Sequence, residues 1–187
     1  MLRPLLLIGL ILCPGSVLAQ NALPDAFYGD WKGVALTNTE GADNLELTAE
    51  DLNVRIEPHD DGFRIYWTTL GHGESEDQLV RKKAEAAFAP TDRLGVFAFD
   101  PQDGSMLMGL FSDPSTSNPL KGEPLLWARV ADRTLAVYGL VINADGGFDL
   151  YHQVRTLTDD GMAAHQIHRM EREPVVIIEG QLKRAGG

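Results

Sequence analysis

Alternation of apolar and polar residues with a period of two constrains this chain more than any other feature. Residues 52–56 and 63–67 alternate in this way on either side of a short turn at 59–62. The pattern is typical of strands with one buried face. Asp61-Gly62 supplies the positive-φ position that a tight hairpin turn needs, and Asp-Gly pairs recur at 103–104, 145–146 and 160–161. The sequence therefore predicts a succession of antiparallel hairpins.

The turns divide the chain into short candidate strands. We expect strands near 30–37, 51–57, 63–69, 79–88, 94–100, 105–111, 124–130, 134–142, 147–157 and 162–171, with an eleventh at 174–183. Residues 77–89 are ambiguous because their Lys and Ala content favours a helix. A helix there would interrupt the hairpins, so we predict a strand. Residues 38–50 and 112–123 are predicted loops, the second rich in turn-forming residues.

So many consecutive strands indicate an all-β fold. An open sheet of this width would leave two unpaired edges, and closure into a barrel removes them. We therefore predict a single antiparallel up-and-down β-barrel of about eight to ten strands, with a β-sandwich as the alternative. A barrel of this size is either filled by its own side chains or holds one small ligand.

The first 19 residues have the pattern of a secretory signal peptide. Arg3 precedes an apolar run at 5–12, and Ala19 is a small residue at a plausible cleavage point. The run is too short to span a bilayer, which takes about 20 residues. We expect residues 20–187 to form the mature domain, secreted or exported to a bacterial periplasm. An N-terminal anchor and a lipoprotein at Cys13 are the alternatives, but Leu12 is not the small residue that lipidation requires.

Charge and cysteine content exclude several classes of function. Cys13 is the only cysteine, so the mature chain would lack a disulfide, a cysteine metal ligand and a cysteine nucleophile. The formal net charge is −11. Binding to nucleic acid or to an anionic membrane surface needs clustered Lys and Arg, so we predict neither after signal cleavage.

The segment Leu23–Gly33 resembles the opening of the lipocalins and related calycin barrels. Gly29-Asp30-Trp31 matches their Gly-x-Trp motif, with Phe27 upstream. The resemblance implies a calycin-like barrel in which the glycine allows a tight bend and Trp31 plugs the closed end. It also implies an arginine packed across this tryptophan, for which Arg169 or Arg172 is the candidate. The chain departs from the family in its β-branched segment 174–182 and its lack of a disulfide.

Side chains that could bind a ligand lie on several predicted strands. The candidates are Trp67, Trp127, Tyr138, Tyr151, His152, Arg155 and His168. The strand at 148–157 has an apolar face that includes His152, and a polar face formed by Tyr151, Gln153 and Arg155. If the apolar face points inward, the interior is apolar apart from one histidine, His152. If the polar face points inward, it could bind an anionic group.

His152 and His168 are equally distant from the turn at Asp160, so we expect them to pair and share a face. A metal or a proton relay would then be geometrically possible. No carboxylate on these strands completes such a site. We therefore predict no metal, no cofactor and no catalytic residue.

Three functions remain open at this point. The first is an exported protein that holds one small, mainly apolar or amphipathic ligand in the barrel. The second is a structural or interaction module with a filled barrel, because residues 134–142 are apolar on both faces and need a cover, such as a partner protein or a second copy. Side chains that could fill the barrel are Trp67, Trp127, Phe97, Phe99 and Met108. The third is an enzyme that uses Tyr151, His152, Arg155 or His168, although the chain has no nucleophile elbow and no phosphate loop.

Overall fold

The computed structural model describes residues 21–39, 48–72, 79–100, 125–142, 146–171 and 174–186. The predicted signal peptide with Cys13, the expected strand at 105–111 with Met108, and the expected loop at 112–123 lie outside these residues. A short 3-10 helix, η1, spans Asp25–Phe27. No helix in the described ranges is long and apolar enough to cross a membrane.

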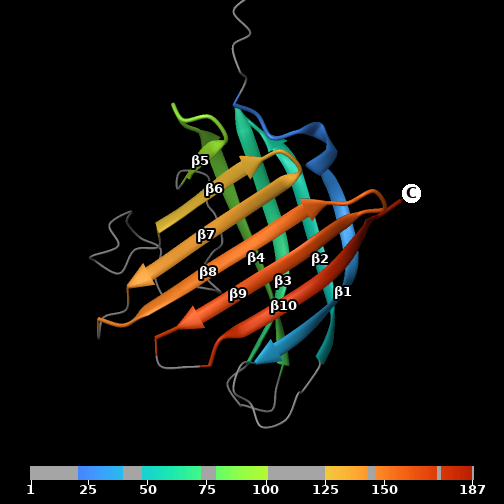
Figure 1. The fold of residues 1–187 in the computed structure, drawn as a ribbon, viewed down its shortest axis with the longest axis vertical. Helices are drawn as coiled ribbons and strands as arrows, with labels where there is room; N and C mark the ends of the chain where they lie inside the picture. Colours follow the sequence, from blue (N-terminus) through green and yellow to red (C-terminus); the bar gives the residue numbers. More distant parts are fainter. Residues whose placement is uncertain are drawn as a thin grey trace, which may run out of the picture.

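Ten strands follow η1 in the described part of the chain. They are β1 (Gly29–Thr39), β2 (Thr48–His59), β3 (Gly62–His72), β4 (Leu79–Pro90), β5 (Val96–Phe99), β6 (Leu125–Ala131), β7 (Thr134–Ile142), β8 (Phe148–Leu157), β9 (Met162–Met170) and β10 (Val176–Arg184). Each is antiparallel to its neighbours in sequence, and β10 pairs with β1 to close the barrel. The prediction of an all-β, up-and-down antiparallel barrel is confirmed. In Figure 1, β6–β10 form a front layer whose strands run across β1–β5 behind them.

Residues 79–89 of the ambiguous segment at 77–89 form a strand, as predicted, because β4 pairs along most of its length with β3. The expected loop at 38–50 is partly wrong. The ladder between β1 and β2 extends to Thr37 and Thr48, and strand structure continues to Thr39, so only residues 40–47 remain outside the described strands. The expected eleventh strand at 174–183 is β10, the strand that closes the barrel.

Aromatic side chains fill one end of the barrel. Phe63 stacks on Phe88 with ring centroids 5.2 Å apart, and Phe97 meets Phe63 edge-on at 5.1 Å. All three are fully buried, as is Phe27 from η1. Burial of a large aromatic side chain removes roughly 150–250 Å² of surface from water. This end of the interior is therefore a packed apolar core.

Trp31 lies in the same filled end. Its indole Nε1 donates a hydrogen bond to the carbonyl oxygen of Phe27 at 2.9 Å. Gly29 has φ +128°, a backbone conformation that favours glycine. The guanidinium that packs over the Trp31 ring, 4.5 Å from its centroid, belongs to Arg184. The same group donates to the carbonyl oxygens of Ala26 and Tyr28 and so ties η1 to the barrel.

The expectation that Arg169 packs over Trp31 is wrong. Arg169 is an exposed residue of β9, and β9 is not the last barrel strand. Because β10 closes the barrel, the arginine at its end reaches the tryptophan instead. Arg172, the other candidate, lies outside the described residues.

Gly33 on β1 provides a test of the tight closure between β1 and β10. A Cβ atom built there would lie 1.8 Å from the carbonyl oxygen of Gln181, so this backbone must move to accept any side chain. We expect Gly33→Ala to lower the free energy of unfolding by about 2 kcal/mol or more, measured by urea denaturation. The control is Val34→Ala at the neighbouring exposed position, with an expected change below about 1 kcal/mol. Equal losses in the two variants would contradict the close approach.

Candidate functional site

Strand β8 turns its polar face toward the barrel interior. Gln153 and Arg155 are each only 4% exposed, and both are paired with residues of the inner surface on β7 and β9. Because successive side chains of a strand point to opposite faces, Tyr151 shares this inner face and His152 does not. The choice left open by the sequence is therefore decided in favour of the polar set.

Arg155 lies next to the filled end of the barrel. Its register partners are Leu135 on β7 and Ala164 on β9, and the row continues through two more small residues, Gly180 and Ala35. These small side chains leave room for a long guanidinium inside the barrel.

Arg155 makes one hydrogen bond to another described side chain, from Nη2 to Oε1 of Gln153 at 2.8 Å. Among the described residues no carboxylate forms an ion pair with it. Burial lowers the pKa of Arg155 to about 10, so the side chain still carries its charge at neutral pH.

Several buried polar atoms of the interior have no hydrogen-bond partner among the described residues. They include Nε and Nη1 of Arg155, Nε1 of Trp67 and Oγ1 of Thr37. Leaving a buried polar atom unsatisfied costs roughly 1–3 kcal/mol, and more for a charged group. Buried polar atoms of folded proteins are normally paired, so these atoms call for partners that the described side chains do not supply.

The polar inner surface continues along β8 and β9 away from the filled end. Gln153 is opposite Gln166, and Tyr151 is opposite His168. The rings of Tyr151 and His168 are stacked, with centroids 4.0 Å apart and planes at 14°. Burial, together with the nearby Asp149, raises the pKa of Tyr151, so its phenol stays protonated and can donate a hydrogen bond.

The inner surface of β2–β4 differs from that of β8 and β9. Among the side chains that the structure describes there, it carries Leu52, Val54, Trp67 and Ala84, which are buried or half-buried and apolar. The interior thus has one polar wall and one apolar wall. We call the part of the interior between these walls, beyond the aromatic cluster, the lumen.

The predicted pairing of His152 with His168 is wrong by one residue. His152 is opposite Ile167, and His168 is opposite Tyr151, because the turn between β8 and β9 is centred between residues 159 and 160. The two histidines therefore lie on opposite faces of the sheet. Within the described ranges, no group of three or more His, Cys, Asp and Glu residues could hold a metal ion.

The structure divides the seven candidate ligand residues between the two surfaces of the barrel. Trp67, Tyr151, Arg155 and His168 face the lumen, whereas Trp127, Tyr138 and His152 lie outside. On the outside, Trp127 stacks on Tyr138 at 4.9 Å and Tyr138 on His152 at 4.6 Å between ring centroids. Burial and the nearby His165 lower the pKa of His152, which favours its neutral form.

Thr37 faces the lumen but was not predicted from the sequence. A threonine in a strand gives no signal of its own, and only the pairing of β1 with β10 shows where it points. Of the side chains expected to fill the barrel, Phe97 and Trp67 do lie inside, whereas Trp127 does not.

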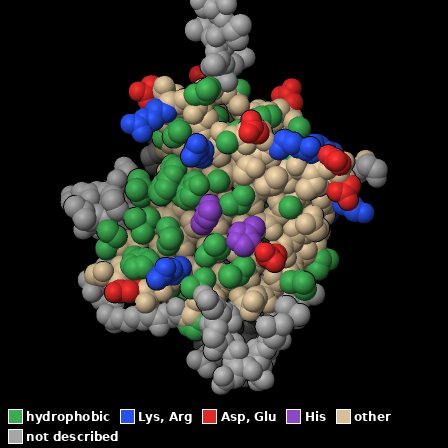
Figure 2. Space-filling view, viewed as in Figure 1, with side chains coloured by type: hydrophobic (Ala, Val, Ile, Leu, Met, Phe, Trp, Pro, Cys, Tyr) green, Lys and Arg blue, Asp and Glu red, His purple; other side chains and the backbone are tan. Residues whose placement is uncertain are grey.

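The stacked rings belong to a larger apolar surface on the outside of β6–β10. This outer apolar face comprises Trp127, Tyr138, Leu140, Leu150, His152, Val154, Ile167 and Ile177. Figure 2 shows hydrophobic side chains gathered over these strands, with histidine side chains among them. Each of these side chains is half-buried, and apolar side chains gathered on one face mark a contact site for another molecule.

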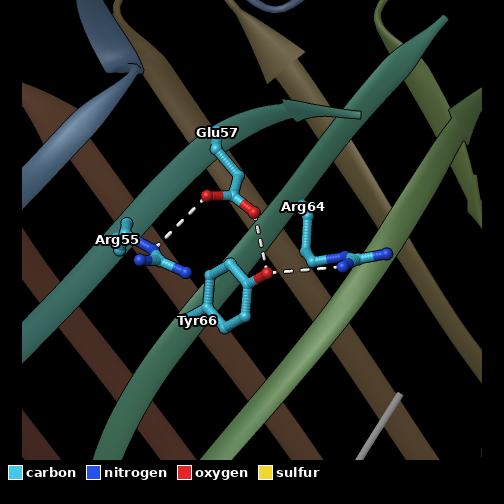
Figure 3. A network of polar contacts seen from close by, with 4 residues as sticks. All are labelled: Arg55, Glu57, Arg64 and Tyr66. Atoms are coloured by element: carbon cyan, nitrogen blue, oxygen red, sulfur yellow. Dashed lines mark hydrogen bonds and ion pairs between the residues drawn. The ribbon is translucent and has the colours of Figure 1, made fainter. Parts of the chain in front are cut away.

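The outside of β1–β4 is mainly polar, although Val34 and Leu36 of β1 are exposed there. Tyr66 donates a hydrogen bond to Glu57 at 2.7 Å and accepts one from Arg64 at 3.3 Å, while Arg55 lies over its ring (Figure 3). A shallow groove of about 350 Å³ runs across these strands. Its lining residues come from β1–β4 alone, with none from the opposite wall, so it lies outside the lumen.

Comparisons with known proteins leave the family open. No protein-family model and no curated protein matches the sequence. Among solved structures, the S-type phycobiliprotein lyase CPES from Guillardia theta matches with a TM-score of 0.41 and 10% identity. The match covers 86% of this chain and 89% of the lyase. A likeness of this size carries no argument about function, which rests on the lumen itself.

Replacing Arg155 tests whether the guanidinium serves the fold or a ligand. Arg155→Met keeps the length of the side chain and removes a buried charge that lacks a described counter-ion. Because such a charge costs free energy, we expect the free energy of unfolding to stay unchanged or rise by up to about 3 kcal/mol. Urea denaturation measures it. Arg155→Ala is the control, and it should lose about 2 kcal/mol or more because it leaves a cavity. A comparable loss in Arg155→Met would mean that the charge stabilises the fold.

Proposed function

We propose that this protein binds one small, mainly apolar molecule in the lumen of its barrel. The observation that carries the proposal is the set of buried polar atoms on the inner face, from Arg155, Trp67 and Thr37, that lack a described partner. A bound ligand would supply the missing acceptors and donors.

The two walls of the lumen support the mainly apolar character of the ligand. The wall formed by β2–β4 offers Leu52, Val54 and Trp67 to an apolar body, and the wall formed by β8 and β9 offers a few polar groups. Binding sites for small molecules commonly combine an apolar cavity with a small number of placed polar groups. The aromatic cluster around Phe63 fills the end of the barrel next to Arg155. The ligand therefore lies between Arg155 and the opposite end of the barrel.

We further propose that binding takes place outside the cytoplasm, in a bacterial periplasm or after secretion. Residues 1–19, with their basic start, apolar run and small residue at position 19, support export. Catalysis in the lumen is not part of the proposal, because His152 and His168 do not share a face.

A neutral fluorescent probe tests the proposed function. N-phenyl-1-naphthylamine is apolar and uncharged, and its emission rises in an apolar site. We expect saturable binding of one equivalent with a Kd in about the micromolar range, and Ala84→Trp, which fills the apolar wall with a larger side chain, should weaken it at least about tenfold. Val34→Trp on the outside is the matched control and should bind like the wild type. No saturable binding, or equal binding by both variants, would contradict a lumenal site.

The outer apolar face favours a second function, self-association. The row beside the stacked rings runs from Arg129 through Ala136, Val154 and His165 to Glu179. A two-fold axis through the middle of this row would place Arg129 of one copy opposite Glu179 of the other. Opposite charges would then meet at both ends of an apolar contact, so a second copy of this chain is the partner that fits the face.

Sedimentation velocity tests the self-association. We expect a dimer at about 100 µM that dissociates in the variant Ile167→Asp, because this change places a charge in the centre of the apolar contact. The matched control is Val34→Asp on the exposed outside of β1, which should remain dimeric. A monomeric wild type at this concentration would rule the dimer out.

A further inference from the structure

We propose that the lumenal ligand carries a single anionic group, a carboxylate or a sulfonate, and that Arg155 binds this group. The inference rests on the proposed function, since it names the chemical class of the molecule that the lumen holds. Neither the fold nor the apolar wall requires a charge on the ligand. The requirement comes from Arg155 alone.

The geometry of Arg155 leaves the right donors available. A guanidinium has five N–H donors in a fixed plane, and the described bond to Gln153 uses only Nη2. Nε and Nη1 are buried without a described partner. Nη2 has a second N–H, which lies beside either Nε or Nη1, so one two-donor edge of the guanidinium remains open. Such an edge matches two oxygens of a carboxylate or of a sulfonate, a pairing that is both strong and specific. A neutral carbonyl would satisfy a donor but would leave the buried charge unbalanced.

The surroundings of Arg155 favour one negative charge rather than two. The groups that share its face are Gln153 on its own strand and, from the neighbouring strands, the side chains of Leu135 and Ala164. The next rows add Gln166, Tyr151 and His168, and among the described side chains Asp149 is an acid at the far end of the same face. Arg155 is the fixed cation of these rows, so a monoanion neutralises it locally. A dianion such as a phosphate monoester would add an unmatched negative charge to a face that also carries Asp149.

The position of Arg155 also sets the orientation of the ligand. The next inward row toward the turn is Met162 and Leu182, which are fully buried and form the floor beside the aromatic cluster. The anionic group therefore enters first and lies deepest. The apolar body extends from Arg155 toward the stacked rings of Tyr151 and His168, against the wall that carries Trp67.

The overall charge of the protein surface would not produce a preference for an anionic over a neutral ligand. The chain has a net charge of −11, so its overall field repels an anion. A preference for an anionic ligand must come from a local cation. A buried pair is also screened less by salt than an exposed one, so the preference should persist at high ionic strength.

A matched pair of probes tests the inference. 1-Anilinonaphthalene-8-sulfonate and N-phenyl-1-naphthylamine share one aromatic skeleton and differ by a sulfonate. We expect the wild-type chain to bind the sulfonate probe at least about tenfold more tightly than the neutral probe. Raising the salt concentration from about 0.05 to 0.5 M should reduce this ratio less than about threefold. Arg155→Met should bring the ratio close to one, while the neutral probe still binds.

Arg129→Met is the matched control because Arg129 is an exposed arginine on the outside of β6. It should keep the wild-type ratio. Equal binding of both probes by the wild type would overturn the anionic ligand and leave lumenal binding intact, whereas failure of both probes to bind would overturn the proposed function as well. A ratio lost in Arg129→Met but kept in Arg155→Met would place the anion on the surface and overturn the inference. Even if Arg155→Met does not fold, equal binding of both probes by the wild type would overturn the anionic ligand.

Discussion

Closure of the barrel by the pairing of β1 with β10 is the constraint on which the rest of the structure depends. It gives every strand one inner and one outer face, and the register then assigns each side chain to one of them. A shift of one residue in any ladder would exchange the two faces of a strand. The consequence is greatest on β8, where Arg155 and Gln153 lie inside and His152 and Val154 lie outside.

This assignment on β8 runs against the usual distribution of residues. A strand of a small barrel normally keeps apolar side chains inside and polar side chains at the surface. Here a charged residue is 4% exposed in the interior, while the outside of the same sheet carries Trp127, Tyr138 and Ile167. Both departures cost free energy in an isolated chain, one through an unbalanced charge and the other through apolar surface in water. A ligand in the lumen and a second copy on the outside would offset them.

Much of the fold follows from the sequence because its signals are local. Alternation and Asp-Gly turns place the hairpins, and the cost of unpaired edges favours closure. The same reasoning recovers β4 against the helix propensity of its lysines and alanines. Contacts between residues far apart in the sequence are harder to predict. The guanidinium over Trp31 comes from Arg184 rather than Arg169. Which arginine lies on the last barrel strand depends on which strand closes the barrel, and that strand is β10.

The sequence predicts only part of the candidate site, again because long-range strand pairing is not a local signal. Tyr151, Gln153 and Arg155 could be recognised as one polar face, but the sequence of β8 has two self-consistent faces and does not say which is inside. The predicted centre of the turn between β8 and β9 differs slightly from the observed one. This difference was enough to predict that His152 pairs with His168, whereas the two histidines lie on opposite faces of the sheet. Thr37 gave no signal at all. Register decides these points, and register depends on the whole closed barrel.

Native mass spectrometry of the protein, isolated under gentle conditions from cells that make it naturally, tests the central claim most directly. The account predicts a chain that carries one small molecule, released when acid unfolds the barrel and detected as an anion in the negative-ion spectrum. A mass equal to that of the polypeptide alone, at every gentle setting, would contradict it.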